Sequence, residues 1–327
     1  MRIAIRVSAA VSGAEKRPKC AVWVFCALIL LAVPLAPADK FPALAGPYLG
    51  QEPPGDTPVL FAPGILACEQ GYHSSIVFSP YLREAIWCPM RGVESRLFIA
   101  RMADGKWGTP QETDLGMAAG ILDPIYSVDG KKLFFLSLAP DKPGGTARES
   151  IWWVERTPGG FSRPTPIDEV VRAHPTHWTF SFARNGNLYF TSEIQGARGG
   201  QDIYVARFAG GKYLAPEDLG PAVNSPGKDF APFIAADESY LVFARLGPGT
   251  RKADLYISYR EPEGGWTRAR DMGPTVNSAG HDLAPYVSPD GRYLFFVSQR
   301  ERLNGIYWLS AAIIHKLRPG KFTGGAN

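Results

Sequence analysis

A turn flanked by two short apolar strands recurs five times along the 327 residues of this chain. Its clearest copy is His281–Ser298, which reads HDLAPYVSPDGRYLFFVS. The four earlier copies span residues 73–89, 121–137, 177–192 and 229–244. The glycine position of the turn is held successively by Leu82, Gly130, Gly186, Glu238 and Gly291. A repeat of about 50 residues is typical of folds in which each copy forms one packing unit.

The rest of each repeat also has the pattern of β-structure. In Ser288-Pro-Asp-Gly291, proline restricts φ, aspartate bonds the backbone and glycine adopts a positive φ, which favours a tight turn. A further β-branched and aromatic strand recurs at 97–99, 151–153, 203–205, 255–257 and 306–308. An aromatic residue precedes a fourth short strand at Trp107, Phe161, Tyr213 and Trp266. Four short strands per repeat predict the blades of a β-propeller, and 35 glycines with 29 prolines exclude a helical bundle.

The last repeat lacks a fourth strand, because residues 310–317 have the pattern of a short helix. Residues 58–66 align with 216–224, proline on proline, so the N-terminal segment is expected to supply the missing strand and close the ring. Closure also removes two sheet edges that would otherwise be exposed. We therefore predict an all-β propeller of five four-stranded blades over residues 57–317, with an N-terminal extension at 39–56 and a C-terminal tail at 318–327. Six blades would need a sixth repeat, which the sequence does not contain.

The first 38 residues are typical of a signal peptide. Five basic residues and one acidic residue fall in this segment, residues 20–35 are apolar, and Ala36-Pro37-Ala38 has the small residues of a cleavage site. The segment carries the whole formal charge of +4, and the remainder is balanced with 30 basic and 30 acidic residues. We expect export to the periplasm or the cell exterior, with no nucleic-acid partner and no membrane span after cleavage. The alternative is a retained anchor, although the apolar run is shorter than the roughly 18–20 residues that span a bilayer.

Two cysteines, Cys68 and Cys88, lie outside the signal segment. An oxidising compartment permits a disulfide between them, whereas two separate buried thiols would contribute to the core as small apolar groups. The sequence leaves both alternatives open.

The repeats also resemble a known family. The Ser-Pro-Asp-Gly hairpin, followed by Leu294-Phe-Phe296 and then Ile306-Tyr-Trp308, resembles the WD-type propeller repeats of the TolB-type superfamily. The resemblance covers about residues 57–317 and includes the helical tail of secreted bacterial propellers of this kind. It implies a binding or scaffolding role and supplies no shared catalytic residues. The first and fourth repeats depart from the motif, with Tyr81-Leu82 and Asp237-Glu238 where Asp-Gly would stand, so the form of those two turns is left open.

Polar residues gather at the start of the innermost strands, where the central channel of a propeller opens. Alignment of the repeats places His73, Ile121, His177, Asp229 and Asp282 in equivalent positions. His281 precedes Asp282, and Asp123 lies two residues past the Ile121 position. Imidazoles and carboxylates converging on one axis predict a site for a polar ligand or a divalent cation, with no cofactor otherwise expected. The alternative is that they bond neighbouring strand ends around a water-filled channel; no zinc-type spacing supports a metal.

The loops between second and third strands form a second candidate surface, at 89–95, 137–150, 191–201, 245–253 and 298–304. Their basic residues are Arg91, Lys142, Arg148, Arg198, Arg245, Arg251, Lys252, Arg300 and Arg302. Their acidic residues are Glu94, Asp141, Glu149, Glu193 and Glu301. This excess of basic groups favours anionic ligands such as uronic sugars or carboxylates, and a solvated loop surface is the alternative.

The sequence favours an exported binding or interaction module that holds a glycan, a small polar ligand or an envelope protein. The alternative is a carbohydrate-active hydrolase or lyase. Inner strands of adjacent blades could hold the carboxyl groups of Asp229 and Asp282 about 6.5–9.5 Å apart, as an inverting enzyme requires. Asp123 would be a third acid. A third interpretation is a scaffold that binds a partner at its rim. No Gly-x-Ser-x-Gly motif, catalytic cysteine context or phosphate loop is present, so no catalytic residue is assigned.

Overall fold

The computed structural model describes residues 41–66, 71–72, 74–89, 95–117, 119–140, 145, 147–301 and 304–319. The predicted signal peptide at 1–38, Cys68 and His73 lie outside these residues. Among the described residues, no helix is both long and apolar enough to span a membrane.

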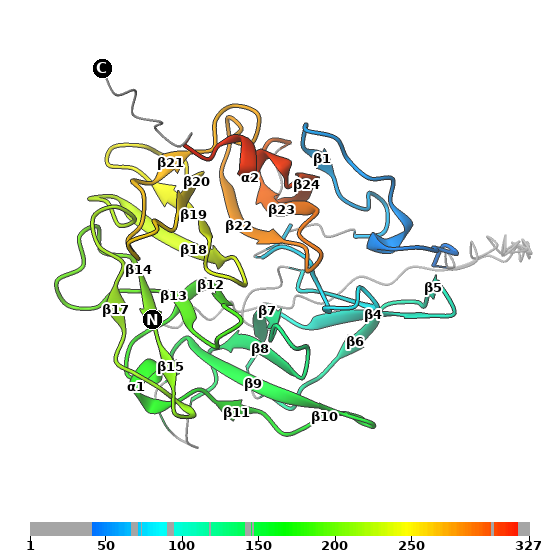
Figure 1. The fold of residues 1–327 in the computed structure, drawn as a ribbon. Helices are drawn as coiled ribbons and strands as arrows, with labels where there is room; N and C mark the ends of the chain where they lie inside the picture. The colour runs from blue at the N-terminus through cyan, green and yellow to red at the C-terminus, as the bar shows by residue number, and fades with distance from the viewer. Residues whose placement is uncertain are drawn as a thin grey trace, which may run out of the picture. The chain divides into compact units, whose positions relative to one another are not determined.

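Five antiparallel sheets stand around a ring as the blades of a β-propeller, which confirms the predicted fold class (Figure 1). The first blade consists of β2 (Val77–Phe78), β3 (Glu84–Trp87), β4 (Leu97–Ala103) and β6 (Gln111–Thr113). The second consists of β7 (Ile121–Tyr126), β8 (Lys132–Ser137), β9 (Ser150–Thr157) and β11 (Thr165–Pro166). The third consists of β12 (His177–Phe182), β13 (Leu188–Ser192), β14 (Asp202–Ala206) and β17 (Glu217–Asp218). The fourth consists of β18 (Lys228–Ile234), β19 (Tyr240–Leu246), β20 (Asp254–Tyr259) and β21 (Arg270–Asp271).

The fifth blade is completed by the N-terminal strand, as predicted. It consists of β22 (Asp282–Val287), β23 (Tyr293–Ser298), β24 (Gly305–Ser310) and β1 (Val59–Leu60). In β1, Val59 pairs with Trp308 and Leu60 with Tyr307, the same place in the blade that β17 takes in the third blade. The helix expected after Trp308 is α2 (Ala312–Lys316).

Short additional elements extend the blades beyond four strands. Strands β5 (Lys106–Trp107) and β10 (Gly160–Phe161) pair with β4 and β9, and β15 (Phe208–Ala209) pairs with β16 (Lys212–Tyr213) as a separate hairpin. The two short helices are η1 (Tyr48–Gly50) and α1 (Glu169–Arg172).

All five predicted turns between first and second strands form, including the two that depart from the motif. In each turn the residue at the glycine position donates its N–H to the carbonyl three residues earlier. Leu82 and Glu238 adopt φ values of 55° and 58° there, the left-handed region that glycine takes in the other repeats. The turn geometry is therefore retained at the cost of local backbone strain.

Two nearly identical segments, LGPAVNS at 219–225 and MGPTVNS at 272–278, have a common structural role. The side-chain amide of Asn224 accepts from the N–H of Ile203 and donates to its carbonyl, and Asn277 does the same to Leu255. Each asparagine thus ties the chain leaving a blade to the third strand of that blade, which explains why the segment repeats.

Candidate functional site

Asp229 is the second residue of the inner strand β18, Asp282 is the first residue of β22, and both are completely buried. Asp229 accepts from the backbone N–H of Ser225 at 2.6 Å and forms an ion pair with Arg245 at 2.5 Å. Burial raises the pKa of Asp229, and Arg245 opposes that rise. These contacts are those expected of a residue that joins two strand ends.

Asp282 repeats this arrangement one blade later. It accepts from the N–H of Ser278 at 2.5 Å and lies 3.4 Å from Arg300, whose guanidinium also donates to the carbonyl of Val276 at 2.7 Å. Both carboxylates therefore match the structural alternative given above: they bond the ends of neighbouring strands and are shielded from any ligand.

His177 lies one residue later than the repeat alignment placed it. His177 pairs with Thr191 in the second strand of its blade. Asp229 pairs with Arg245, and Asp282 pairs with Ser298. Each of these two partners lies one residue nearer the C-terminal end of the second strand of its blade than Thr191 does. A larger bulge between His177 and Ser181 causes the shift, and it turns the side chain to the opposite face of the blade. The structure therefore separates His177 from the two aspartates.

The two histidines have different partners. His177 Nδ1 lies 3.1 Å from the carboxylate of Glu149, and this bond raises the pKa of His177 while burial opposes the rise. His281 Nδ1 accepts from the N–H of Ala253 at 3.1 Å. The described residues contain no group of three or more His, Cys, Asp or Glu side chains placed to hold a metal ion.

Replacing Glu149 by glutamine is expected to lower the pKa of His177, because the hydrogen bond with Glu149 is the largest of the effects on this pKa and raises it. Protonated His177 stabilises the fold fully below its ordinary pKa of about 6.5. This contribution is lost as pH rises through the raised pKa of the folded state. An NMR titration of the His177 ring in both proteins measures the shift. Glu193→Gln is the control, since Glu193 contributes less, and an unchanged titration in Glu149→Gln would contradict the assignment.

Asp123 is buried and lines a cavity of about 20 Å³. Residues of all five inner strands line it, and the hydroxyls of Ser74, Ser75 and Thr179 have no hydrogen-bond partner among the described residues. A cavity of this size holds roughly one water molecule, so it is far smaller than a sugar ring. Cys88 has a buried, free thiol, whose pKa is raised by burial and then by the charge of Asp123.

The loops between second and third strands lie where they were predicted, but their basic residues are largely paired with carboxylates. Besides Arg245 and Arg300, Arg198 lies 3.7 Å from Asp218 and Lys252 lies 2.5 Å from Asp254. Arg91, Glu94, Asp141, Lys142 and Arg302 lie outside the described residues. Ion pairing therefore reduces the positive charge that the sequence suggested for this face.

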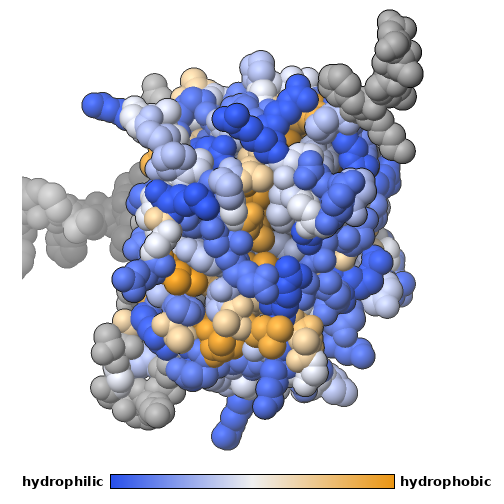
Figure 2. Space-filling model, turned by 60° about the vertical axis from the view of Figure 1, so that its left-hand side comes forward, coloured by the Kyte–Doolittle hydropathy of each residue, from blue (hydrophilic) through white to orange (hydrophobic). Residues whose placement is uncertain are grey.

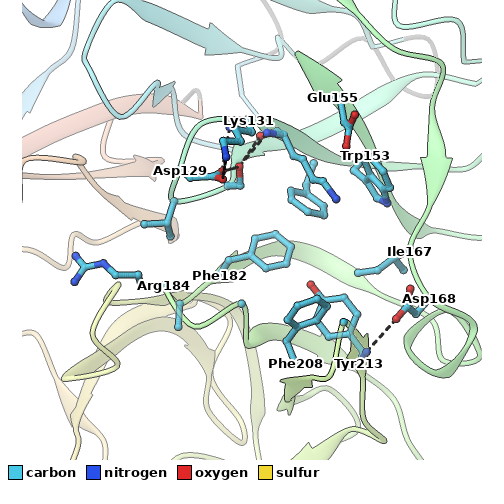
Figure 3. Close-up of a pocket in the computed structure, with 17 residues that line it drawn as sticks. Asp129, Lys131, Trp153, Glu155, Ile167, Asp168, Phe182, Arg184, Phe208 and Tyr213 are labelled. Atoms are coloured by element: carbon cyan, nitrogen blue, oxygen red, sulfur yellow. Dashed lines mark hydrogen bonds and ion pairs between the residues drawn. The ribbon is translucent and has the colours of Figure 1, made fainter. Parts of the chain in front are cut away.

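A cavity of about 710 Å³ opens between the second and third blades (Figure 3). Five aromatic side chains line it, and we call it the aromatic groove: Phe134, Trp153, Phe182, Phe208 and Tyr213. Three acidic and three basic residues also line it: Asp129, Glu155, Asp168, Lys131, Lys132 and Arg184. The groove has the volume of an ordinary small-ligand site.

The hairpin β15–β16 forms one wall of the aromatic groove. The rings of Phe208 and Tyr213 lie 5.0 Å apart, and the N–H of Tyr213 donates to Asp168 of the second blade at 3.0 Å (Figure 3). Phe208 rests on Gly186, where a Cβ would come within 2.9 Å of its ring. On the opposite wall, the Lys132 ammonium lies 3.7 Å from the centre of the Trp153 ring.

A second cavity of about 580 Å³ opens between the first and second blades. Three arginines line it, and we call it the arginine pocket: Arg83, Arg101 and Arg156. It shares Asp129, Lys131 and Glu155 with the aromatic groove, so the two cavities meet at the β7–β8 turn.

Exposed apolar side chains border the same two cavities. Tyr81 lines the arginine pocket, Val128 and Phe208 line the aromatic groove, and Leu214 follows Tyr213. Figure 2 shows hydrophobic side chains gathered on the lower part of one face of the molecule. This surface is not evident from the sequence, because Trp153 and Tyr213 occupy apolar positions that recur in the repeats, as residues that pack between blades also would.

Neither a protein-family model nor a curated protein matches the sequence. Among solved structures, a TolB protein from Agrobacterium tumefaciens is similar, with 18% identity, a TM-score of 0.47 and 69% of each chain covered. TolB from Acinetobacter baumannii has 14% identity and a TM-score of 0.46 over 72% of this chain and 53% of that one. An endo-arabinase from Bacteroides thetaiotaomicron has 15% identity and a TM-score of 0.48 over 73% and 92%. At these levels the similarity concerns the fold, and TolB proteins are among the β-propellers that this chain resembles.

Proposed function

We propose that this chain is an exported binding module and that its ligand is a saccharide held in the aromatic groove. The observation that carries the proposal is the set of five aromatic side chains around a cavity of about 710 Å³, with an equal number of acidic and basic side chains beside them. A sugar ring presents C–H groups on its faces and hydroxyl groups at its rim. Aromatic faces and charged donors and acceptors complement those two features.

Binding is favoured over hydrolysis because the carboxylates that the sequence suggested as catalytic acids are not accessible. Asp229 and Asp282 are buried in ion pairs, so they cannot reach a glycosidic bond. A glycosidase needs two accessible carboxylates about 5–5.5 Å or 6.5–9.5 Å apart. The hydrolase or lyase alternative therefore depends on the acids beside the groove, and turnover of a bound glycan is its test.

Phe208→Ala is expected to weaken saccharide binding about 10-fold, as loss of one aromatic contact in a small site does. Phe208 is 41% exposed, so its removal should leave the fold intact. Calorimetric titration with linear gluco-, xylo-, manno- and galacturono-hexasaccharides measures binding, and chromatography of the same mixtures detects cleavage. Leu60→Ala, an exposed apolar residue in β1 of the fifth blade, is the control and should bind as the wild type. Absence of binding to every sugar, equal binding by Phe208→Ala, or cleavage would each overturn the proposal.

A further inference from the structure

A buried carboxylate organises the arginine pocket. Glu84 on β3 is 5% exposed and accepts hydrogen bonds from three side chains. Arg156 donates Nη2 at 2.8 Å, and its Nη1 forms an ion pair with the other carboxylate oxygen at 2.7 Å. Arg101 donates Nε at 2.9 Å, and Tyr126 donates its hydroxyl at 2.7 Å. Two guanidinium groups are thus fixed by one carboxylate, which holds them in place before any ligand arrives.

Arg101 lines the pocket and keeps unused donors. Only its Nε is bonded to Glu84, and its Nη1 and Nη2 groups have no acceptor among the described residues. Its side chain is 49% exposed. The guanidinium of the neighbouring Arg83 is likewise without an acceptor in the described part of the chain. A positioned guanidinium with two free Nη groups matches the geometry of a carboxylate.

The charges around the pocket leave a positive excess. Glu84 offsets one of the two arginines that it binds, and the Lys131 ammonium lies 3.8 Å from Asp129. Bonds from Ser127 and the Lys131 backbone lower the pKa of Asp129, so it stays ionised and offsets Lys131. The charges that remain are the negative charge of Glu155 and the positive charges of Arg83 and of the arginine that Glu84 does not offset. The pocket therefore favours one anion.

We propose that the arginine pocket binds the carboxylate of a sugar acid, so that the ligand of the aromatic groove is a uronic-acid glycan. The proposal rests on the proposed saccharide function. The two cavities share Asp129, Lys131 and Glu155, so one oligosaccharide can place a ring against Phe208 and Tyr213 while its carboxylate bonds Arg101. The acidic sugar supplies the charge for one cavity and the C–H faces for the other.

Hexagalacturonate and its fully methyl-esterified form test this inference, because esterification removes the charge of each carboxyl group and adds only a methyl group. In calorimetric titration of the full chain, we expect the ester to bind about 10-fold more weakly than the acid. Arg101→Gln should weaken binding of the acid by a similar factor and leave that of the ester unchanged. Raising the salt concentration should weaken binding of the acid alone.

Arg207→Gln is the matched control, since Arg207 is a comparably exposed arginine (47%) in an ion pair with Glu217 and outside both cavities. Thermal melting of each variant verifies the fold, and Arg101→Lys, which keeps the charge, should bind the acid more tightly than Arg101→Gln. Equal affinity for acid and ester, with both weakened by Phe208→Ala, would overturn the carboxylate site and support the groove. Binding of no saccharide would overturn the proposed function as well. Tighter, Arg101-dependent binding of inorganic phosphate would overturn the assignment to a sugar acid.

Discussion

Phe61→Ala is expected to lower the free energy of unfolding by about 3–5 kcal/mol. Phe61 directly follows β1, is 2% exposed, and its ring lies 5.0 Å from Trp308 and 5.2 Å from Phe295 in the fifth blade. The same ring lies 6.2 Å from Phe78 in the first blade. Its removal leaves a cavity at the junction of the first and last blades, which surrounding side chains cannot fill without moving. Urea unfolding followed by tryptophan fluorescence measures the loss.

Leu60→Ala is the control for that measurement. Leu60 is the last residue of β1 and directly precedes Phe61, but its side chain is 39% exposed. Its truncation should cost under about 1 kcal/mol, as surface substitutions do. If both variants were equally stable, Phe61 would not be holding the ring closed.

Asp282→Ala is expected to lower the free energy of unfolding by about 3–5 kcal/mol, because it removes a completely buried carboxylate and leaves Arg300, which is 19% exposed, without its partner. The N–H of Ser278 also loses its acceptor. Unfolding in urea measures the cost. Saccharide titration of the folded variant should give the wild-type affinity, because Asp282 lies in neither the aromatic groove nor the arginine pocket.

Two further variants keep the test of Asp282 informative if the alanine protein does not fold. Asp282→Asn preserves an acceptor for Ser278, and Arg300→Gln removes the cation instead of the carboxylate. The double variant should be more stable than the sum of the two single losses predicts, since the pair acts together. A stable Asp282→Ala protein that no longer binds the sugar would restore the ligand site predicted from the sequence.

The fold could be predicted because each repeat contains the local signals for its own strands and turns. The alignment of Pro58 and Pro63 with Pro216 and Pro221 even located the closing strand. The position of His177 could not be predicted in the same way. A two-residue bulge inside β12 moves it, and the alternation of the flanking sequence does not reveal how many residues the bulge absorbs.

The candidate site was harder to predict because residue type alone does not distinguish a ligand group from a structural one. Asp229 and Asp282 could serve as ligand groups or as structural groups. Their contacts with Ser225, Ser278 and the two arginines identify them as structural, and these contacts are visible only in the fold. The aromatic groove depends on β15–β16, a hairpin that reaches from the third blade to the second. Which side chains meet between blades follows from blade packing, and no spacing along the chain encodes it.

The pairing of Val59 with Trp308 has a consequence for how the protein is made. These partners stand at opposite ends of the propeller sequence, so the contact has a very high contact order and closing the loop between them is slow. A growing chain presents β1 long before β24 exists, and the first strand must wait unpaired until synthesis of the fifth blade is complete. The ring therefore assembles after translation of the last repeat, and truncation of the C-terminal blade leaves β1 as an exposed apolar segment prone to aggregation.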